Sequence, residues 1–67
     1  MCRSIKQLRR TSDPPTQAEI AAAALQYIRK VSGYRAPSRA NQAAFDQAVA
    51  DVARATQVLL DGLVIHA

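Results

Sequence analysis

Residues 16–33, with the sequence TQAEIAAAALQYIRKVSG, decide the fold. Thr16 and Glu19 stand three residues apart at the start, as in a capping box, where each side chain accepts a hydrogen bond from the backbone N–H of the other. Apolar residues then recur at the three- and four-residue spacing of one helix face. They include Tyr27, which we expect in the core with its hydroxyl at the rim. A glycine ends the stretch, as is common after a helix, so the pattern predicts a helix over about 16–32.

A second, longer helix is predicted over about 39–63. Pro37 breaks the chain before it, and Ser38 is a favourable N-cap. Apolar residues continue at helical spacing, and no proline or glycine interrupts them before Gly62. Because the loop over 33–38 is short, the two helices must lie antiparallel. The predicted fold class is therefore all-α, an antiparallel helical hairpin without strands.

The two predicted helices differ in length. At 1.5 Å per residue, the helix over 39–63 is about 37 Å long and the helix over 16–32 about 25 Å. The longer helix therefore overhangs by roughly 12 Å, or about eight residues. The overhang carries Leu59, Leu60 and Leu63, and leaving such side chains in water forgoes about 1.5–3 kcal/mol each. We therefore expect a cover over this end.

Two covers are available for the overhanging leucines. A basic N-terminal arm over 1–13 leaves the first helix at the same end, so Ile5 and Leu8, spaced for one helical turn, could pack on Leu59 and Leu63. A second copy of the chain could also cover them and give a four-helix dimer. These two arrangements are compatible. The candidate interaction surface consists of Ile5, Leu8, Leu59, Leu60 and Leu63.

Length and composition set the scale of the protein. A chain of 67 residues forms one small helical domain over 1–67 with a thin core, the more so because much of its apolar content is alanine. Cys2 is the single cysteine, which excludes a disulfide framework. No apolar run approaches the roughly 20 residues that span a bilayer. We therefore expect no membrane association and a cytoplasmic location.

Several segments resemble a known family. They are the opening Met1-Cys2-Arg3-Ser4-Ile5-Lys6, the central stretch AAALQYIRKVSG over 22–33, and then Pro37-Ser38, Asn41 and Ala44-Phe45. Over nearly the whole chain they are similar to a family of short bacterial proteins known only as a domain of unknown function. Where that family often has an aromatic residue before the two prolines, this chain has RRTS. The resemblance supports the helix boundaries and implies no activity, cofactor or catalytic residue.

The formal net charge of +4 is concentrated in two clusters without acids, over 1–10 and 29–39. In the second cluster the cations stand beside an aromatic ring, a combination suited to phosphate and base contacts. The plainer interpretation is a solvated helix end whose cations match the helix dipole. The nucleic-acid or anion candidates are Arg29, Lys30, Tyr34, Arg35 and Arg39.

Cys2 and His66 are expected at the same end of the hairpin. Arg3 and Lys6 would favour the Cys2 thiolate, and a cysteine–histidine pair could hold a soft metal or form a redox centre. Two ligands are too few for a closed zinc site, and the plainer interpretation is a small buried cysteine with a histidine on a frayed tail. We therefore predict no metal site and no cofactor, with Cys2 and His66 as the candidates if a metal binds.

The sequence carries no catalytic constellation. Asp46 and Asp51 stand five residues apart, which does not place two carboxylates on one helix face, and no glycine-rich phosphate loop or cofactor motif occurs. We therefore predict a non-enzymatic helical structural or protein-interaction module that could form a homodimer or bind a protein partner. The alternatives are a small basic nucleic-acid-binding protein acting through 29–39, and a thiol- or metal-responsive protein acting through Cys2.

Overall fold

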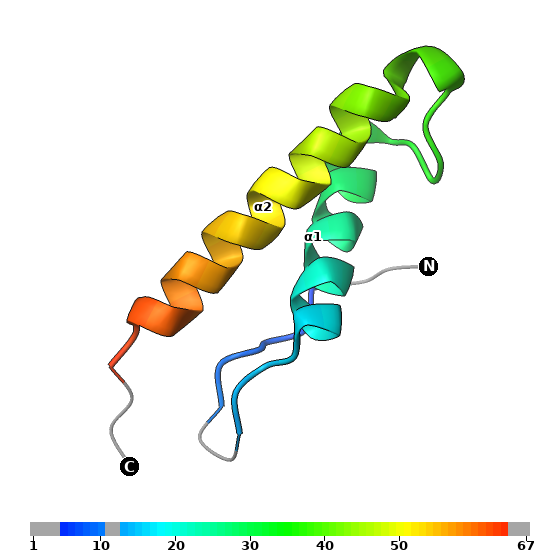
Figure 1. Ribbon diagram of the computed structural model, residues 1–67. Coiled ribbons are helices and arrows are strands. Elements are labelled where there is room, and N and C mark those ends of the chain that lie inside the picture. Colours follow the sequence, from blue (N-terminus) through cyan, green and yellow to red (C-terminus); the bar gives the residue numbers. More distant parts are fainter. Residues whose placement is uncertain (1–4, 11–12, 65–67) are drawn as a thin grey trace.

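The computed structural model describes residues 5–10 and 13–64. It contains helix α1 (Gln17–Ser32), a short 3-10 turn η1 (Arg39–Asn41) and helix α2 (Gln42–Gly62). The two helices lie against each other, joined at one end by the loop that contains η1 (Figure 1). No strand occurs in the described part of the chain. The predicted all-α antiparallel hairpin is confirmed.

Both ends of α1 are closed by the groups that the sequence predicts. The N–H of Glu19 donates to Thr16 Oγ1 at 3.1 Å, and the N–H of Thr16 donates to Glu19 Oε1 at 2.8 Å, which completes the capping box. At the other end Gly33 has a φ of 77°, in the left-handed region, and its N–H donates to the carbonyl of Arg29 at 3.0 Å. The boundaries of α1 are therefore set by local sequence.

The second helical segment begins differently from the prediction. Ser38 precedes it, but its side chain makes no capping bond to the backbone. The Ser38 hydroxyl instead accepts a hydrogen bond from Asn41 Nδ2 at 3.0 Å, and the same amide donates to the Tyr34 hydroxyl at 3.2 Å. Residues Arg39–Asn41 form a 3-10 turn, and α2 begins only at Gln42.

Three glutamine–aspartate pairs stabilise α2 along its surface. In each pair the glutamine amide donates to the aspartate one helical turn later, at 2.8–2.9 Å. Pairs at this spacing contribute about 0.2–0.5 kcal/mol each to helix stability. The pairs are Gln42–Asp46, Gln47–Asp51 and Gln57–Asp61.

A side-chain hydrogen bond joins the two helices near the start of α1. Gln17 Nε2, in the first residue of α1, donates to Gln57 Oε1 at 3.1 Å. Because α2 continues to Gly62, five residues follow Gln57, a length of about 7.5 Å. The overhang is therefore shorter than the eight residues or so that we expected, since residues 39–41 form a separate turn.

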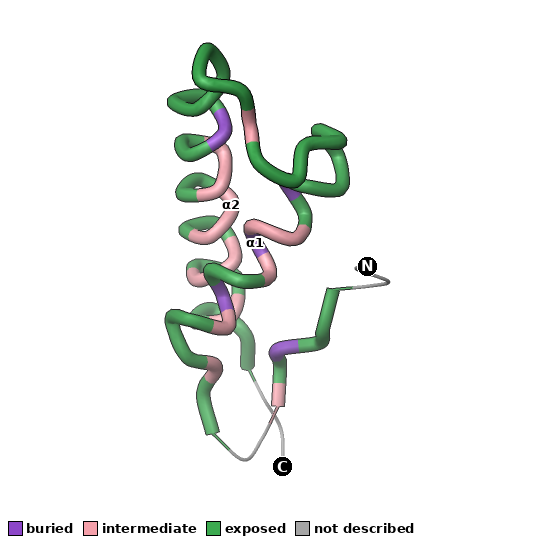
Figure 2. The backbone as a smooth tube through the Cα atoms, turned by 90° about the vertical axis from the view of Figure 1, so that its right-hand side faces the viewer, coloured by how far each residue is buried: buried purple, intermediate pink, exposed green. Residues whose placement is uncertain are grey.

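The buried core is small. Ile20, Ala24 and Ile28 recur every four residues along α1, and Phe45 of α2 and Leu8 of the arm join them (Figure 2). These are the only buried residues in the described part of the chain. A core of this size is typical of a chain near the lower limit of independent folding.

The N-terminal arm is part of the fold. Residues 5–10 contain no helical turn and run back beside α1 (Figure 1). Leu8 is the anchor, with only 8% of its surface exposed. The spacing of Ile5 and Leu8 suggested one helical turn, but the structure has an arm without a helical turn over 5–10.

Candidate interaction groove

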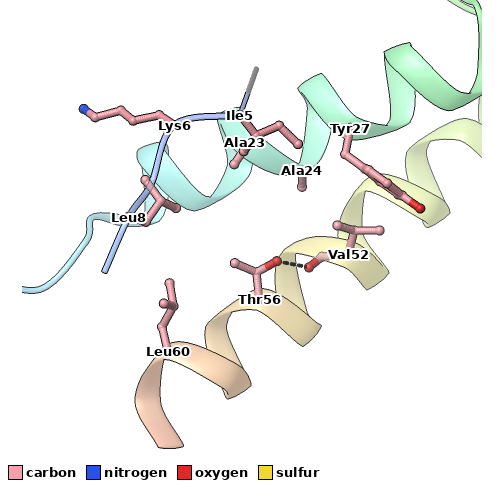
Figure 3. A pocket seen from close by; sticks show the side chains of 9 residues that line it. All are labelled: Ile5, Lys6, Leu8, Ala23, Ala24, Tyr27, Val52, Thr56 and Leu60. Carbon is pink, nitrogen blue, oxygen red and sulfur yellow. Dashed lines mark hydrogen bonds between the residues drawn. The ribbon is translucent and has the colours of Figure 1, made fainter. Parts of the chain in front are cut away.

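Side chains from the arm and from both helices surround an open groove with a volume of about 320 Å³ (Figure 3). Its surface is almost entirely apolar. The volume falls at the lower end of the roughly 300–1,000 Å³ typical of small-molecule pockets, so the groove is large enough for a few apolar groups. The lining residues are Ile5, Lys6, Leu8, Ala23, Ala24, Tyr27, Val52, Thr56 and Leu60.

Two alanines of α1 make room for the groove. Ala23 is half-buried, and Ala24 is only 1% exposed. Their single methyl groups leave space that Leu8 of the arm partly fills from one side (Figure 3). The alanine-rich composition of α1 therefore has a structural use beyond helix propensity.

The wall contributed by α2 follows one face of that helix. Val52, Thr56 and Leu60 recur every four residues, so their side chains lie one above another. Thr56 Oγ1 donates to the carbonyl oxygen of Val52 at 2.7 Å, which satisfies the hydroxyl inside the helix. The wall therefore offers apolar contacts rather than hydrogen bonds.

Tyr27 stands at the edge of the groove. Its ring points towards α2, near Val52 (Figure 3), and 45% of the residue is exposed. The expectation of a core tyrosine is therefore wrong. The two helices pack against each other along one face only. In the described part of the chain, no further helix or strand covers the side of α1 on which this ring lies.

Glu19 ties the arm to the first turn of α1. Arg10 Nη2 lies 2.8 Å from Glu19 Oε1, and Arg10 Nη1 lies 3.2 Å from Glu19 Oε2. Lys6 Nζ approaches the same carboxylate at 3.5 Å. Arg10 also binds the chain before α1, since its Nε donates to Asp13 Oδ1 at 3.1 Å. One carboxylate of the helix cap therefore joins the arm through two cations.

The ion pair between Arg10 and Glu19 shifts the pKa values of both side chains. The hydrogen bonds from Arg10, followed by the N–H of Thr16, lower the pKa of Glu19 to about 2. The carboxylates of Glu19 and then Asp13 raise the pKa of Arg10 above its usual value. Glu19 is therefore ionised at neutral pH, as an ion pair with Arg10 requires.

The structure brings together three of the five interaction residues predicted from the sequence. Ile5, Leu8 and Leu60 line the groove. Leu59 and Leu63 do not, and they remain 59% and 39% exposed. Leu60, rather than Leu59 or Leu63, therefore faces the groove that the arm lines, because Leu60 lies about 100° further around the helix than Leu59.

Sequence reasoning missed several groove residues. Val52 and Thr56 were not expected to line a site, and Tyr27 was placed in the core. A signal for the α2 wall is present in the sequence, because Val52, Thr56 and Leu60 stand at four-residue intervals. For the arm, the sequence predicts that Ile5 and Leu8 pack on the second helix but not the path of the arm, which the Arg10–Glu19 ion pair ties to the start of α1.

The nucleic-acid and anion candidates lie around the loop that joins the helices. Arg29 Nε donates to the carbonyl of Arg35 at 3.0 Å, which orders part of this loop. Lys30, Arg35 and Arg39 are exposed, and so is Tyr34. Among residues 5–10 and 13–64, no carboxylate lies within ion-pair distance of these cations. The loop end therefore carries unpaired positive charge beside an exposed ring.

The thiol and metal hypothesis concerns residues outside the described ones, since neither Cys2 nor His66 is among them. Within the described ranges, no three or more histidine, cysteine, aspartate or glutamate side chains are grouped so that they could hold a metal ion. A helix long and apolar enough to cross a membrane is also not found there.

Fold and groove together define a small helical hairpin protein whose N-terminal arm completes an apolar surface. The chain belongs to the family described as "Uncharacterized conserved protein (DUF2277)", whose family model matches residues 1–67. No curated protein and no solved structure matches the chain. The resemblance to a domain of unknown function is therefore confirmed at the level of this family.

Proposed function

We propose that this protein is a protein-interaction module, and that the groove between the arm, α1 and α2 holds apolar side chains of a bound polypeptide. The observation that carries the proposal is the open, almost wholly apolar groove of about 320 Å³. Ile5 and Tyr27 at its edge are 47% and 45% exposed. Burying one leucine- or phenylalanine-sized side chain in such a place is worth about 1.5–3 kcal/mol.

The chemistry of the lining favours binding over catalysis. Three lining residues carry polar groups: Lys6, Tyr27 and Thr56. The ammonium of Lys6 points out of the groove (Figure 3) and lies 3.5 Å from Glu19. The hydroxyl of Thr56 is bound to a backbone carbonyl. The lining therefore supplies apolar area but few groups that could transfer a proton to or from a ligand.

Site-specific photocrosslinking tests the proposal. A benzophenone-bearing residue replaces Thr56 in the groove wall or, as a control, the exposed Gln47 on the same helix. Irradiated in cells of the source organism, the Thr56 probe should yield discrete crosslinked products, and the Gln47 probe should yield fewer or none. Equal yields from both positions, or no product from the Thr56 probe, would reject a docking role for the groove.

A second candidate function rests on the unpaired cations of the loop end. Lys30, Arg35 and Arg39 beside Tyr34 could contact a nucleic-acid backbone and a base. Binding of this kind weakens steeply with salt, with a slope set by the number of phosphates neutralised. Fluorescence anisotropy with labelled RNA and DNA should then show binding at about 50 mM salt that a Lys30→Glu change weakens. Unchanged anisotropy for both nucleic acids would reject this alternative.

A further inference from the structure

Uncompensated positive charge is concentrated at the end of the hairpin where the two helices are joined (Figure 1). In the arm, by contrast, Lys6 and Arg10 each lie within ion-pair distance of Glu19. Between Glu19 and Asp46 the chain carries four cations and no acid, and the described part of the chain supplies no carboxylate within ion-pair distance of any of the four. These cations are Arg29, Lys30, Arg35 and Arg39.

Tyr34 is held in place among these cations. Its hydroxyl accepts a hydrogen bond from Asn41 Nδ2 at 3.2 Å, and its backbone N–H donates to Ser32 Oγ at 3.2 Å. The Asn41 amide also donates to the hydroxyl of Ser38 at 3.0 Å, and Ser38 directly precedes Arg39. The residue Tyr34 is nevertheless 39% exposed. The ring is therefore fixed at its hydroxyl and at its backbone but remains open to a ligand.

Asn41 holds this ring instead of capping α2. It stands at the N-cap position of α2, where the side chain of an asparagine commonly accepts a hydrogen bond from the first turn, but no such bond forms. Ser38, before η1, makes no capping bond either. Local rules of this kind are broken most often where a protein meets a ligand. The missing caps therefore indicate that the loop is arranged around Tyr34.

A second hydrogen bond orders the side of the loop next to α1. Arg29 Nε donates to the carbonyl of Arg35 at 3.0 Å, which ties the last turn of α1 to the loop. Arg29 and Arg35 thus stand on one side of the loop, and Arg39 stands in η1 at its other end. Tyr34 lies between Arg29 and Arg39 along the chain. We call Tyr34 and the four cations the loop-end patch.

We propose that the loop-end patch binds single-stranded nucleic acid, with the ring of Tyr34 stacked on one unpaired base and the cations on the neighbouring phosphates. The inference rests on the second candidate function and specifies the form of nucleic acid that is bound and the contact that selects it. Single strands are commonly held by aromatic rings beside cations, because an unpaired base offers a free face and each phosphate a negative charge. In a duplex the bases stack on one another, so this ring has no base to contact.

The size of the patch limits the number of nucleotides in contact. One ring accommodates one base, and four cations neutralise no more than four phosphates. Each phosphate neutralised in a single strand contributes about −0.7 to the slope of log K against log salt. The slope should therefore be no steeper than about −2.8.

Fluorescence anisotropy tests the stacked base. Labelled RNA and DNA strands of about 12 nucleotides, within the usual size range of single-strand sites, are compared with their duplexes and with abasic strands of equal length. The wild type should bind the plain strand more tightly than the abasic one. Tyr34→Leu should weaken binding to the plain strand by about 5- to 150-fold, the effect of one stacked base. It should not change binding to the abasic strand or the duplex, and Tyr34→Phe, which keeps the ring, should stay close to the wild type.

The salt dependence separates the ring from the cations. Arg39→Gln should reduce the magnitude of the slope by about 0.7, since one phosphate contact is lost. Tyr34→Leu should leave the slope unchanged, because stacking releases no counterions. Arg54→Gln, a change at an exposed cation in the middle of α2, is the matched control and should alter neither the slope nor the affinity.

The outcomes separate this inference from the function on which it rests. Absence of binding to strands and duplexes alike at about 50 mM salt would reject the loop end as a nucleic-acid site, and the inference with it. Binding that Lys30→Glu weakens but Tyr34→Leu leaves unchanged would uphold a nucleic-acid contact and overturn the stacked base. Equal affinity of the wild type for plain and abasic strands would overturn it too. That last comparison needs no variant, so it decides the question even if Tyr34→Leu loses helix content by circular dichroism.

Discussion

Arg10 and Glu19 form a two-point ion pair, with N–O distances of 2.8 and 3.2 Å, that ties the N-terminal arm to the first turn of α1. Glu19 is at the same time the second half of the α1 capping box. One carboxylate therefore stabilises the start of the helix and holds the arm that forms one side of the groove. Disturbing this pair should affect both the local helix end and the groove.

Removing the Arg10 side of the pair should release the arm. Arg10→Gln leaves the capping box intact but deletes the two-point contact with Glu19, so Leu8 should lose its fixed place in the groove. We expect amide hydrogen exchange over 5–10, followed by mass spectrometry, to become several-fold faster, while exchange in the middle of α2 changes little. Arg9→Gln, a change at the exposed neighbour, is the control. Equal protection of the arm in all three proteins would show that Leu8 alone holds it.

The depressed pKa of Glu19 predicts how stability depends on pH. In the folded protein this pKa is about 2, against a reference value of 4.5. Because the folded-state value is the lower one, the contribution of Glu19 is fully present above about pH 4.5 and is lost as the pH falls towards 2. The melting temperature should therefore rise with pH across this window.

A charge-removing variant isolates this contribution. Glu19→Gln should flatten the rise in melting temperature between about pH 2 and 4.5, as followed by circular dichroism at 222 nm. Asp61→Asn, at the exposed end of a glutamine–aspartate pair on α2, should retain the rise. A wild-type melting temperature that stays level through this window would contradict the assignment.

Local chemistry explains which parts of this fold the sequence predicts. The Thr16–Glu19 capping box and the turn at Gly33 depend on residues within one or two turns of each other, so their pattern is visible in the sequence and both are confirmed. The 3-10 turn before α2 was missed, because it accompanies side-chain hydrogen bonds from Asn41 to Tyr34 and Ser38 that compete with a helix cap.

The candidate site was predicted less completely, because it depends on how separate segments meet. Sequence periodicity places Leu59, Leu60 and Leu63 on the second predicted helix but does not say which of them faces the groove beside the arm. That choice follows from how α2 is rotated about its axis where it packs on α1. The contact between the helices joins residues far apart in the sequence, such as Gln17 and Gln57, which are hydrogen-bonded and forty residues apart. The exposure of Tyr27 likewise depends on whether another layer covers α1, a property of the whole assembly rather than of local sequence.

The burial of Leu8 predicts that the arm contributes to global stability. Truncation of a buried leucine costs about 2–5 kcal/mol, and Leu8 is only 8% exposed. Because the arm is an edge element, we expect Leu8→Ala to lower the free energy of unfolding by about 2 kcal/mol, the lower end of that range. Urea denaturation followed by circular dichroism measures the change.

Ile5→Ala is the matched control for Leu8→Ala. Ile5 lies three residues away on the same arm and lines the same groove, but 47% of its surface is exposed. Its truncation should cost less than about 1 kcal/mol, since part of the side chain already contacts water. If Ile5→Ala proves as destabilising as Leu8→Ala, the arm must be covered more fully in solution, as a dimer through the groove would require.

The two glycines provide a matched pair that tests backbone conformation alone. A methyl group added at either Gly33 or Gly62 would meet no atom within 4 Å, so neither alanine variant creates a clash. Only Gly33 has a positive φ, 77°, which an alanine adopts at a cost of about 1–2 kcal/mol. Gly62 lies in the last turn of α2, where alanine should stabilise the helix by up to about 1 kcal/mol. Urea denaturation should therefore show opposite changes, with Gly33→Ala less stable and Gly62→Ala at least as stable as the wild type. A stabilising Gly33→Ala change would mean that the loop after α1 can rearrange without its left-handed residue.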